Sequence, residues 1–152
     1  MTAFQPYNHD MPEVFTSAEV VEPRTVARLT VMGEPKAKDR PRAQPGGKGR
    51  SYTTPQTRAA EDVIRDAWNT LDLPDYPKGA KFRMDVVFYL GTKRHVDVDN
   101  LTKLVKDALN KVAYDDDNLV YVERSQKFHT TRDRARTEIV LSLIDPDREE
   151  AA

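Results

Sequence analysis

A strictly alternating segment followed by one with helical spacing most constrains the fold of this chain. Residues 82–90 place Phe82, Met84, Val86, Phe88 and Leu90 on one side, which is the period of a strand with one buried face. About ten residues later the spacing becomes i, i+3, i+4, which predicts an amphipathic helix with Asp99 or Asn100 as its cap and with an apolar face formed by Leu101, Leu104, Val105, Ala108, Leu109 and Val112. Each apolar face must be buried against another element, so the pattern predicts a sheet covered by helices.

The remaining elements complete this arrangement. Residues 26–32 alternate like a strand, and Thr54-Pro55 reads as the N-cap and first position of a helix of about four turns. The apolar face of that helix comprises Ala60, Val63, Ile64, Ala67, Trp68 and Leu71. Residues 119–128 and 135–144 suggest two strands of an antiparallel hairpin joined by residues 129–134. We therefore predict an α+β single domain in which a mixed β-sheet packs with two amphipathic helices.

Length and composition set further limits. A chain of 152 residues suits one domain, and the absence of cysteine excludes a disulfide scaffold, a Cys-ligated zinc site and a thiol nucleophile. We find neither an apolar run of about 18 residues nor the apolar centre of a secretory signal, so we expect a soluble intracellular protein with no membrane partner. We assign residues 25–144 to the folded domain, residues 1–24 to a flexible N-terminal arm and residues 145–152 to an acidic tail.

Charge is unevenly distributed although the net charge is only −1. Residues 24–50 carry eight basic and two acidic side chains, and residues 33–50 are rich in Gly and Pro. A basic loop of this kind can wrap phosphates without reading sequence, and a disordered solubilising loop is an equally good interpretation when it is taken alone. The basic residues concerned are Lys36, Lys38, Arg40, Arg42, Lys48 and Arg50.

The chemistry of the chain is concentrated in residues 95–120. Asp97 and Asp99 are two residues apart, so in extended backbone they would share a face just before a helix, and residues 115–117 supply a third carboxylate. Oxygen ligands without His or Cys suit Mg²⁺ or Mn²⁺, which support phosphodiester hydrolysis. Lys103, one turn after Asp99, could contact the scissile phosphate or the leaving group, or simply pair with Asp99.

Simpler interpretations of these residues remain open. Isolated aspartates are more often helix caps and turn residues than ligands, and we assign His95 and His129 only to solvated positions. The intervening helix would be about 20 Å long. The returning chain must therefore run back, or a second subunit must contribute, before the third carboxylate can meet the first two.

Four motifs in order resemble the RusA-type Holliday junction resolvases of bacteria and phages: P-K-A-K-D-R-P-R (35–42), D-V-D-N-L-x-K (97–103), D-A-L-N (107–110) and D-D-x-x-V (116–120). The resemblance implies a Mg²⁺-dependent homodimeric endonuclease, with Mn²⁺ as a substitute, that cleaves four-way DNA junctions in recombination and repair in the cytoplasm of a bacterial cell. It places the catalytic and metal-binding carboxylates on Asp97, Asp99 and Asp117, with Asp116 as the alternative third ligand, and the functional lysine on Lys103.

Two kinds of alternative are kept. One is a less selective nuclease that cuts branched DNA. The other has no catalysis: a DNA-binding module whose aspartates are caps and turns, or a structural dimer in which the basic loop contacts acidic protein. Metal-dependent nicking separates the first kind from the second.

Overall fold

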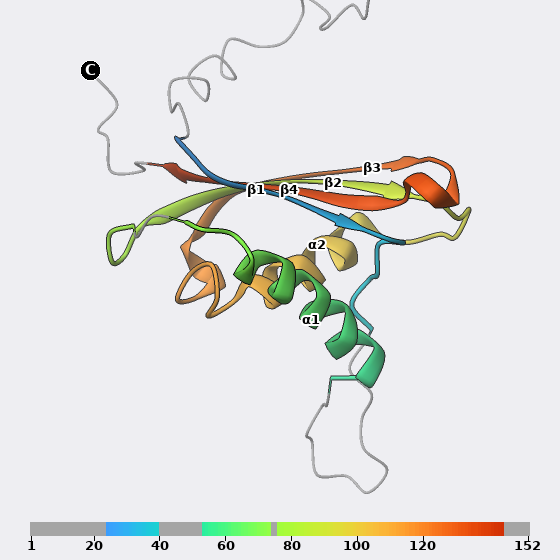
Figure 1. Cartoon of the computed structure of the whole chain (residues 1–152), viewed down its shortest axis with the longest axis horizontal. Helices are drawn as coiled ribbons and strands as arrows, with labels where there is room; N and C mark the ends of the chain where they lie inside the picture. The colour runs from blue at the N-terminus through green and yellow to red at the C-terminus, as the bar shows by residue number, and fades with distance from the viewer. Residues whose placement is uncertain (1–23, 40–52, 74–75, 145–152) are drawn as a thin grey trace, which may run out of the picture.

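The computed structural model describes residues 24–39, 53–73 and 76–144. Four strands and two long helices follow one another in these ranges, together with two short 3₁₀ turns, η3 (Asp117–Leu119) and η4 (Arg132–Arg134). The main elements are β1 (Arg24–Met32), α1 (Pro55–Asn69), β2 (Lys81–Leu90), α2 (Val98–Leu109), β3 (Val120–His129) and β4 (Arg136–Ile144). Figure 1 shows both helices on one side of the sheet, which confirms the predicted α+β domain.

The sheet is mixed, with strand order β1-β4-β2-β3. β2 and β3 run parallel because α2 returns the chain to the end at which β2 began, whereas β4 is antiparallel to both β1 and β2. The alternation of β2 is confirmed. Its five helix-facing side chains are at most 1% exposed, and they pack beneath the apolar face of α2.

The predicted hairpin between residues 119–128 and 135–144 is wrong. β3 and β4 lie on opposite sides of β2, and the connection between them crosses the end of that strand. The Thr130 N–H donates to the Leu90 carbonyl at 2.8 Å. A β-carbon at Gly91 would lie only 2.8 Å from the α-carbon of Arg132, so a residue without a side chain is needed where the connection passes.

The first helix begins as predicted. The Thr54 hydroxyl accepts the Thr57 N–H at 3.2 Å, and Pro55 occupies the first turn. Ile64 and Trp68 are buried, but Val63 is 54% exposed and its assignment to the buried face is wrong. Val63 lines a cavity of about 380 Å³ between α1 and the segment that follows β1, whereas Ile64 and Trp68 belong to the core cluster.

The second helix begins earlier than predicted. Its N-cap is Asp97 rather than Asp99 or Asn100. It also ends earlier, because Asn110 is extended and Lys111 adopts the left-handed conformation with φ 65°, so Val112 lies in the turn beyond the helix. Several residues around the start of α2 are good caps, and local preference alone does not choose among them.

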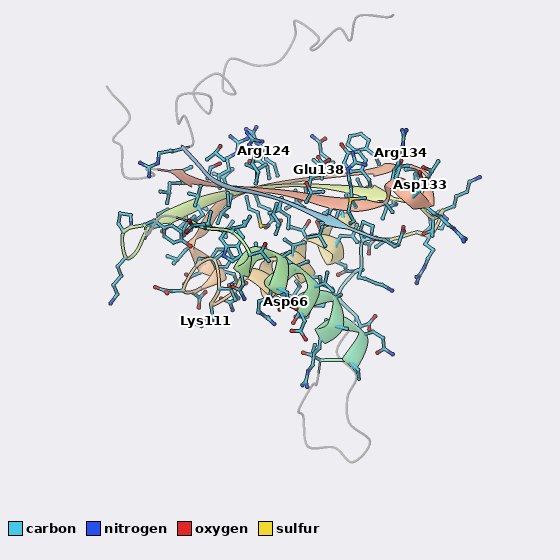
Figure 2. All side chains as sticks on the ribbon, viewed as in Figure 1. Asp66, Lys111, Arg124, Asp133, Arg134 and Glu138 are labelled. Carbon is cyan, nitrogen blue, oxygen red and sulfur yellow. The ribbon has the colours of Figure 1, made fainter. Side chains whose placement is uncertain are left out.

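The face of the sheet opposite the helices carries charged and apolar side chains together. Figure 2 shows Arg124 and Glu138 on this face, with Asp66 and Lys111 on the helical side. Exposed apolar residues of the sheet are Met32, Tyr121, Val122 and Phe128. Neither helix within the described ranges has the length and apolar character needed to span a membrane.

Candidate metal and DNA-binding site

A row of polar contacts holds α2 against β3. The Lys106 ammonium lies 3.0 Å from Glu123, the hydroxyls of Thr102 and Ser125 lie 2.8 Å apart, and a third contact follows nearer the start of the helix. There the Lys127 ammonium donates to the Val96 carbonyl at 2.7 Å. The three contacts follow α2 from its last turn to the residues before it, so the helix and strand together form one polar seam.

A small cavity of about 170 Å³ opens on this seam, and three of its five lining residues are carboxylates. Positions 99, 103 and 106 share one face of α2 because they follow the i, i+4, i+7 spacing. Residues from the turn before β3 and from β3 itself close the opposite side. The lining residues are Asp99, Lys103, Lys106, Asp117 and Glu123.

Three of the predicted site residues, Asp99, Lys103 and Asp117, therefore meet at one cavity. Asp97 is not among the residues that line it. The same-face argument for Asp97 and Asp99 does not hold, because Asp97 is extended whereas Asp99 already belongs to the first turn of α2. Both are exposed at the helix N-terminus, where the dipole favours negative charge, and the Asp97 side chain makes no capping hydrogen bond.

The three consecutive aspartates have different surroundings. Asp116 caps η3, because its carboxylate accepts the Asn118 N–H at 2.9 Å. Asp117 lines the acidic cavity, and Asp115 lines a separate cavity near Tyr114. Asp116 is therefore a capping residue, whereas Asp117 faces the acidic cavity.

Sequence reasoning left two residues of this cavity, Lys106 and Glu123, out of the site, and the acidic one is Glu123. It pairs with Met84 in the parallel register, and Met84 faces the helices, so Glu123 projects toward α2. A charged residue on the covered face of a strand is the signal that could have identified it. The face on which Glu123 lies can be identified only after the register of β3 is known.

The donor set is compatible with Mg²⁺. This ion is usually held by one or two carboxylates while water or substrate oxygens fill its other positions. Asp99 and Asp117 supply two such carboxylates, and Glu123 is paired with Lys106. Within residues 24–39, 53–73 and 76–144, no three acidic or histidine side chains lie close enough together to enclose an ion alone.

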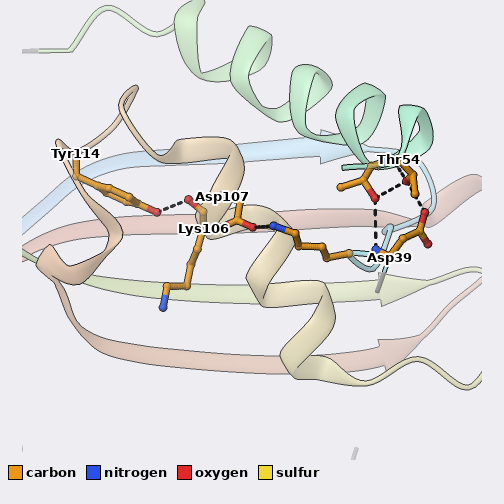
Figure 3. Close-up of polar contacts among 7 residues, drawn as sticks. Asp39, Thr54, Lys106, Asp107 and Tyr114 are labelled. Carbon is orange, nitrogen blue, oxygen red and sulfur yellow. Dashed lines mark hydrogen bonds and ion pairs between the residues drawn. The ribbon is translucent and has the colours of Figure 1, made fainter. Parts of the chain in front are cut away.

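The described start of the basic segment is anchored to both helices. The Lys38 N–H donates to the Asn100 carbonyl at 3.1 Å, and its ammonium forms an ion pair with Asp107 (Figure 3). The Asp39 carboxylate accepts the Thr54 hydroxyl at 2.6 Å. Lys36 is exposed, whereas Lys38 points inward; Arg40, Arg42, Lys48 and Arg50 lie outside the described residues.

Two pKa values reflect the charges between the helices. Burial raises the pKa of Glu61 on α1, with Lys38 opposing and Asp107 adding to the shift. Burial also raises the pKa of Tyr114, and Asp117, Asp107 and Glu123 add to it. The Tyr114 hydroxyl donates to the Lys106 carbonyl at 2.9 Å, so this phenol remains neutral under the α2 terminus.

Comparison with known proteins gives one match. The family described as Endodeoxyribonuclease RusA matches residues 32–142, a range that contains both helices, the described start of the basic segment and every residue of the acidic cavity. No curated protein matches the chain.

Proposed function

Because the chain belongs to the RusA endodeoxyribonuclease family, we propose that it is a Mg²⁺-dependent nuclease that resolves four-way DNA junctions by paired, symmetric nicks. The family implies Holliday junction resolvase activity on branched DNA, and its nucleases generally depend on a divalent metal. The observation that carries the proposal is the cavity where Asp99, Asp117 and Lys103 meet.

The carboxylates would hold the metal. Asp99 and Asp117 line the cavity, Asp97 stands exposed at the helix N-terminus two residues before Asp99, and Asp116 is occupied as a cap, which favours Asp117 as the third ligand. Mg²⁺ held by these carboxylates, or Mn²⁺ in its place, would supply activation of water and neutralisation of charge on the phosphate. Asp97 would complete the set when the substrate's phosphate oxygens enter.

Lys103 would act on the phosphate. It is exposed, lines the cavity and belongs to none of the ion pairs among the described residues. Lys106, by contrast, is paired with Glu123. An unpaired ammonium beside the carboxylates is suited to stabilise charge on the phosphoryl oxygens or the leaving group.

DNA would be held by the basic segment. Lys36 is exposed, whereas Lys38 is occupied by its ion pair with Asp107. Arg40, Arg42, Lys48 and Arg50 continue the segment and stay predicted phosphate contacts. Lys38 instead holds the described start of the segment against α2.

The four-way junction has two strands to cut, and two active sites related by two-fold symmetry match that requirement. The proposed active form is therefore a homodimer acting in the cytoplasm of a bacterial cell. A homodimer would also double the basic surface available to the DNA.

Cleavage of a labelled synthetic four-way junction, beside linear duplex of the same sequence, tests the proposal. We expect paired nicks on the junction with Mg²⁺ and none with EDTA. Asp97→Asn, Asp99→Asn and Asp117→Asn should each lower the rate at least about 100-fold, since even residues behind a metal ligand cost 10–100-fold.

Asp115→Asn is the matched control, because Asp115 is an exposed neighbour that lines a different cavity. It should cleave like the wild type. Full activity in Asp99→Asn would refute the metal site. Equal cutting of junction and duplex would indicate a less selective nuclease, and metal-independent binding without nicks would indicate a non-catalytic DNA-binding module.

A further inference from the structure

A basic cavity of about 480 Å³ lies beyond the end of β2, at the opposite end of the α2–β3 seam from Lys106 and Glu123. Five of its eight lining residues are Lys, Arg or His, and none is acidic. The lining residues are Gly91, Thr92, Lys93, Arg94, His95, Lys127, His129 and Thr130. Residues 91–95 follow β2 and residues 127–130 end β3, so the parallel pairing of these strands brings the two groups together.

The basic side chains of this cavity form no ion pair within the described part of the chain. Five ion pairs join described residues, and none of them includes a residue of this cavity. Lys93, Arg94, His95, Lys127 and His129 are all exposed. By contrast, Lys38 and Lys106 are less exposed and each pairs with an acid.

The walls of the cavity are held in place. Glu34 accepts the Gly91 N–H at 2.8 Å and the Thr92 hydroxyl at 2.9 Å. On the other wall, the Lys127 ammonium donates to the Val96 carbonyl. A site fixed in this way does not have to order its backbone when it binds a ligand.

The cavity adjoins the acidic site along the chain. Its residues 93–95 end two positions before Asp97, and Lys127 contacts the carbonyl of the residue directly before Asp97. The basic and acidic cavities therefore succeed one another along the same seam. An extended polyanion that passes the carboxylates would meet the basic cavity next.

We propose that this cavity binds a backbone phosphate of the DNA strand, adjacent to the one that enters the acidic site, through Lys93, Arg94 and Lys127 with His95 and His129 at its rim. The ligand class follows from the chemistry: several cationic side chains that belong to no ion pair among the described residues favour a phosphodiester, and no base-specific contact is required. This assignment rests on the proposed function for its substrate. It adds positioning residues that the carboxylate site lacks.

The experiment measures binding of the full chain to a labelled four-way junction and to linear duplex in EDTA, from 50 to 200 mM salt. Lys93→Ala and Arg94→Ala should each lower the slope of log affinity against log salt by about 0.9, and the double variant by about twice as much. The ratio of the wild-type DNA affinity to that of each single variant should then fall roughly threefold between 50 and 200 mM salt. Both DNAs should respond alike.

Lys78→Ala is the matched control. Lys78 is an exposed lysine that precedes β2, whereas Lys93 follows it, so it removes the same charge from the opposite end of the strand. Its slope should equal that of the wild type. Thermal denaturation should show that all of the variants are folded, because the substituted side chains are exposed.

Unchanged slopes in Lys93→Ala and Arg94→Ala would overturn the assignment, as would an equal loss in Lys78→Ala, which would reveal only diffuse charge. Because EDTA prevents metal-dependent cleavage, the outcome is separate from the proposed function. Altered salt slopes in the variants, together with a wild type that cleaves no DNA, would support the phosphate site and refute the proposed nuclease. Junction cleavage by the wild type, together with unaltered salt slopes in the variants, would support the nuclease and refute the phosphate site. Failure of the wild type to bind either DNA would refute both.

Discussion

The ion pair between Lys38 and Asp107 gives the sharpest test of how the basic segment is attached. The two side chains are only 23% and 21% exposed, and Glu61 lies close enough for Lys38 to affect its pKa. Lys38→Met would leave Asp107 uncompensated next to Glu61. Asp107→Asn would leave Lys38 without its partner, so we expect each change to destabilise the fold.

The magnitude follows from the partial burial. Two unit charges about 4 Å apart attract by about 4 kcal/mol at an effective dielectric constant of 20, and desolvation and side-chain ordering offset much of this. A coupling free energy of roughly 1–3 kcal/mol therefore remains between Lys38 and Asp107. Lys36→Met, an exposed control two residues away, should change the free energy of unfolding by less than about 0.5 kcal/mol.

The assay is urea unfolding of the wild type, the two single variants and the double variant, with Trp68 as the probe. Trp68 is the only tryptophan and is 5% exposed, so its fluorescence reports the packing of α1. Additive effects within about 0.3 kcal/mol would refute the ion pair. A second result would also refute the ion pair. In it, Lys38→Met has the same free energy of unfolding as Lys36→Met, but its slope of log DNA affinity against log salt is lower by about one unit. Lys38 would then be a phosphate contact.

Two further predictions concern the ends of the seam. Gly91→Ala should destabilise the fold by about 1–3 kcal/mol in urea unfolding, because its β-carbon would press on the Arg132 backbone and on the Glu34 carboxylate; a cost below about 0.5 kcal/mol would contradict the close crossing. Tyr114→Phe should cost about 1 kcal/mol near neutral pH through its lost hydrogen bond. The folded pKa of Tyr114 is raised above the usual 10.0, so its stabilisation is present below pH 10 and is lost as pH rises, and the difference from Tyr114→Phe should shrink above pH 10. A constant difference in pH-dependent unfolding would contradict this.

Local patterns were sufficient for several elements. The alternation of β2, the Thr54-Pro55 start of α1 and the apolar face of α2 depend on neighbours within a few residues, and the structure confirms each of them. The bounds of α2 were less predictable, because Asp97, Asp99 and Asn100 are all acceptable caps. Val63 was misassigned because helical spacing does not show how wide the contact with α2 will be.

Strand pairing was not predictable in the same way. β3 and β4 are consecutive and are joined by a short connection, so the sequence favoured a hairpin, whereas the structure places β2 between them. That choice depends on the crossover by α2 and on Gly91, which allows the connection to pass the end of β2. Both are contacts between segments far apart in the chain.

The amino-acid sequence by itself was sufficient to select candidate residues for the chemistry. Residue type and spacing pointed to Asp97, Asp99 and Lys103 and to a third carboxylate among residues 115–117, and the family resemblance then selected Asp117. Their family resemblance agrees with the match over residues 32–142.

Only the tertiary structure decided which charges meet. Lys38 and Asp107 are 69 residues apart in sequence, and Glu123 joins Asp99 only through the register of β3. Likewise Lys93 and Lys127 share a basic cavity only because β3 lies parallel to β2. Charge acts through space, and a side chain looks the same in sequence whether it is paired or free. The division into ion pairs, an acidic cavity and a basic cavity therefore had to wait for the fold.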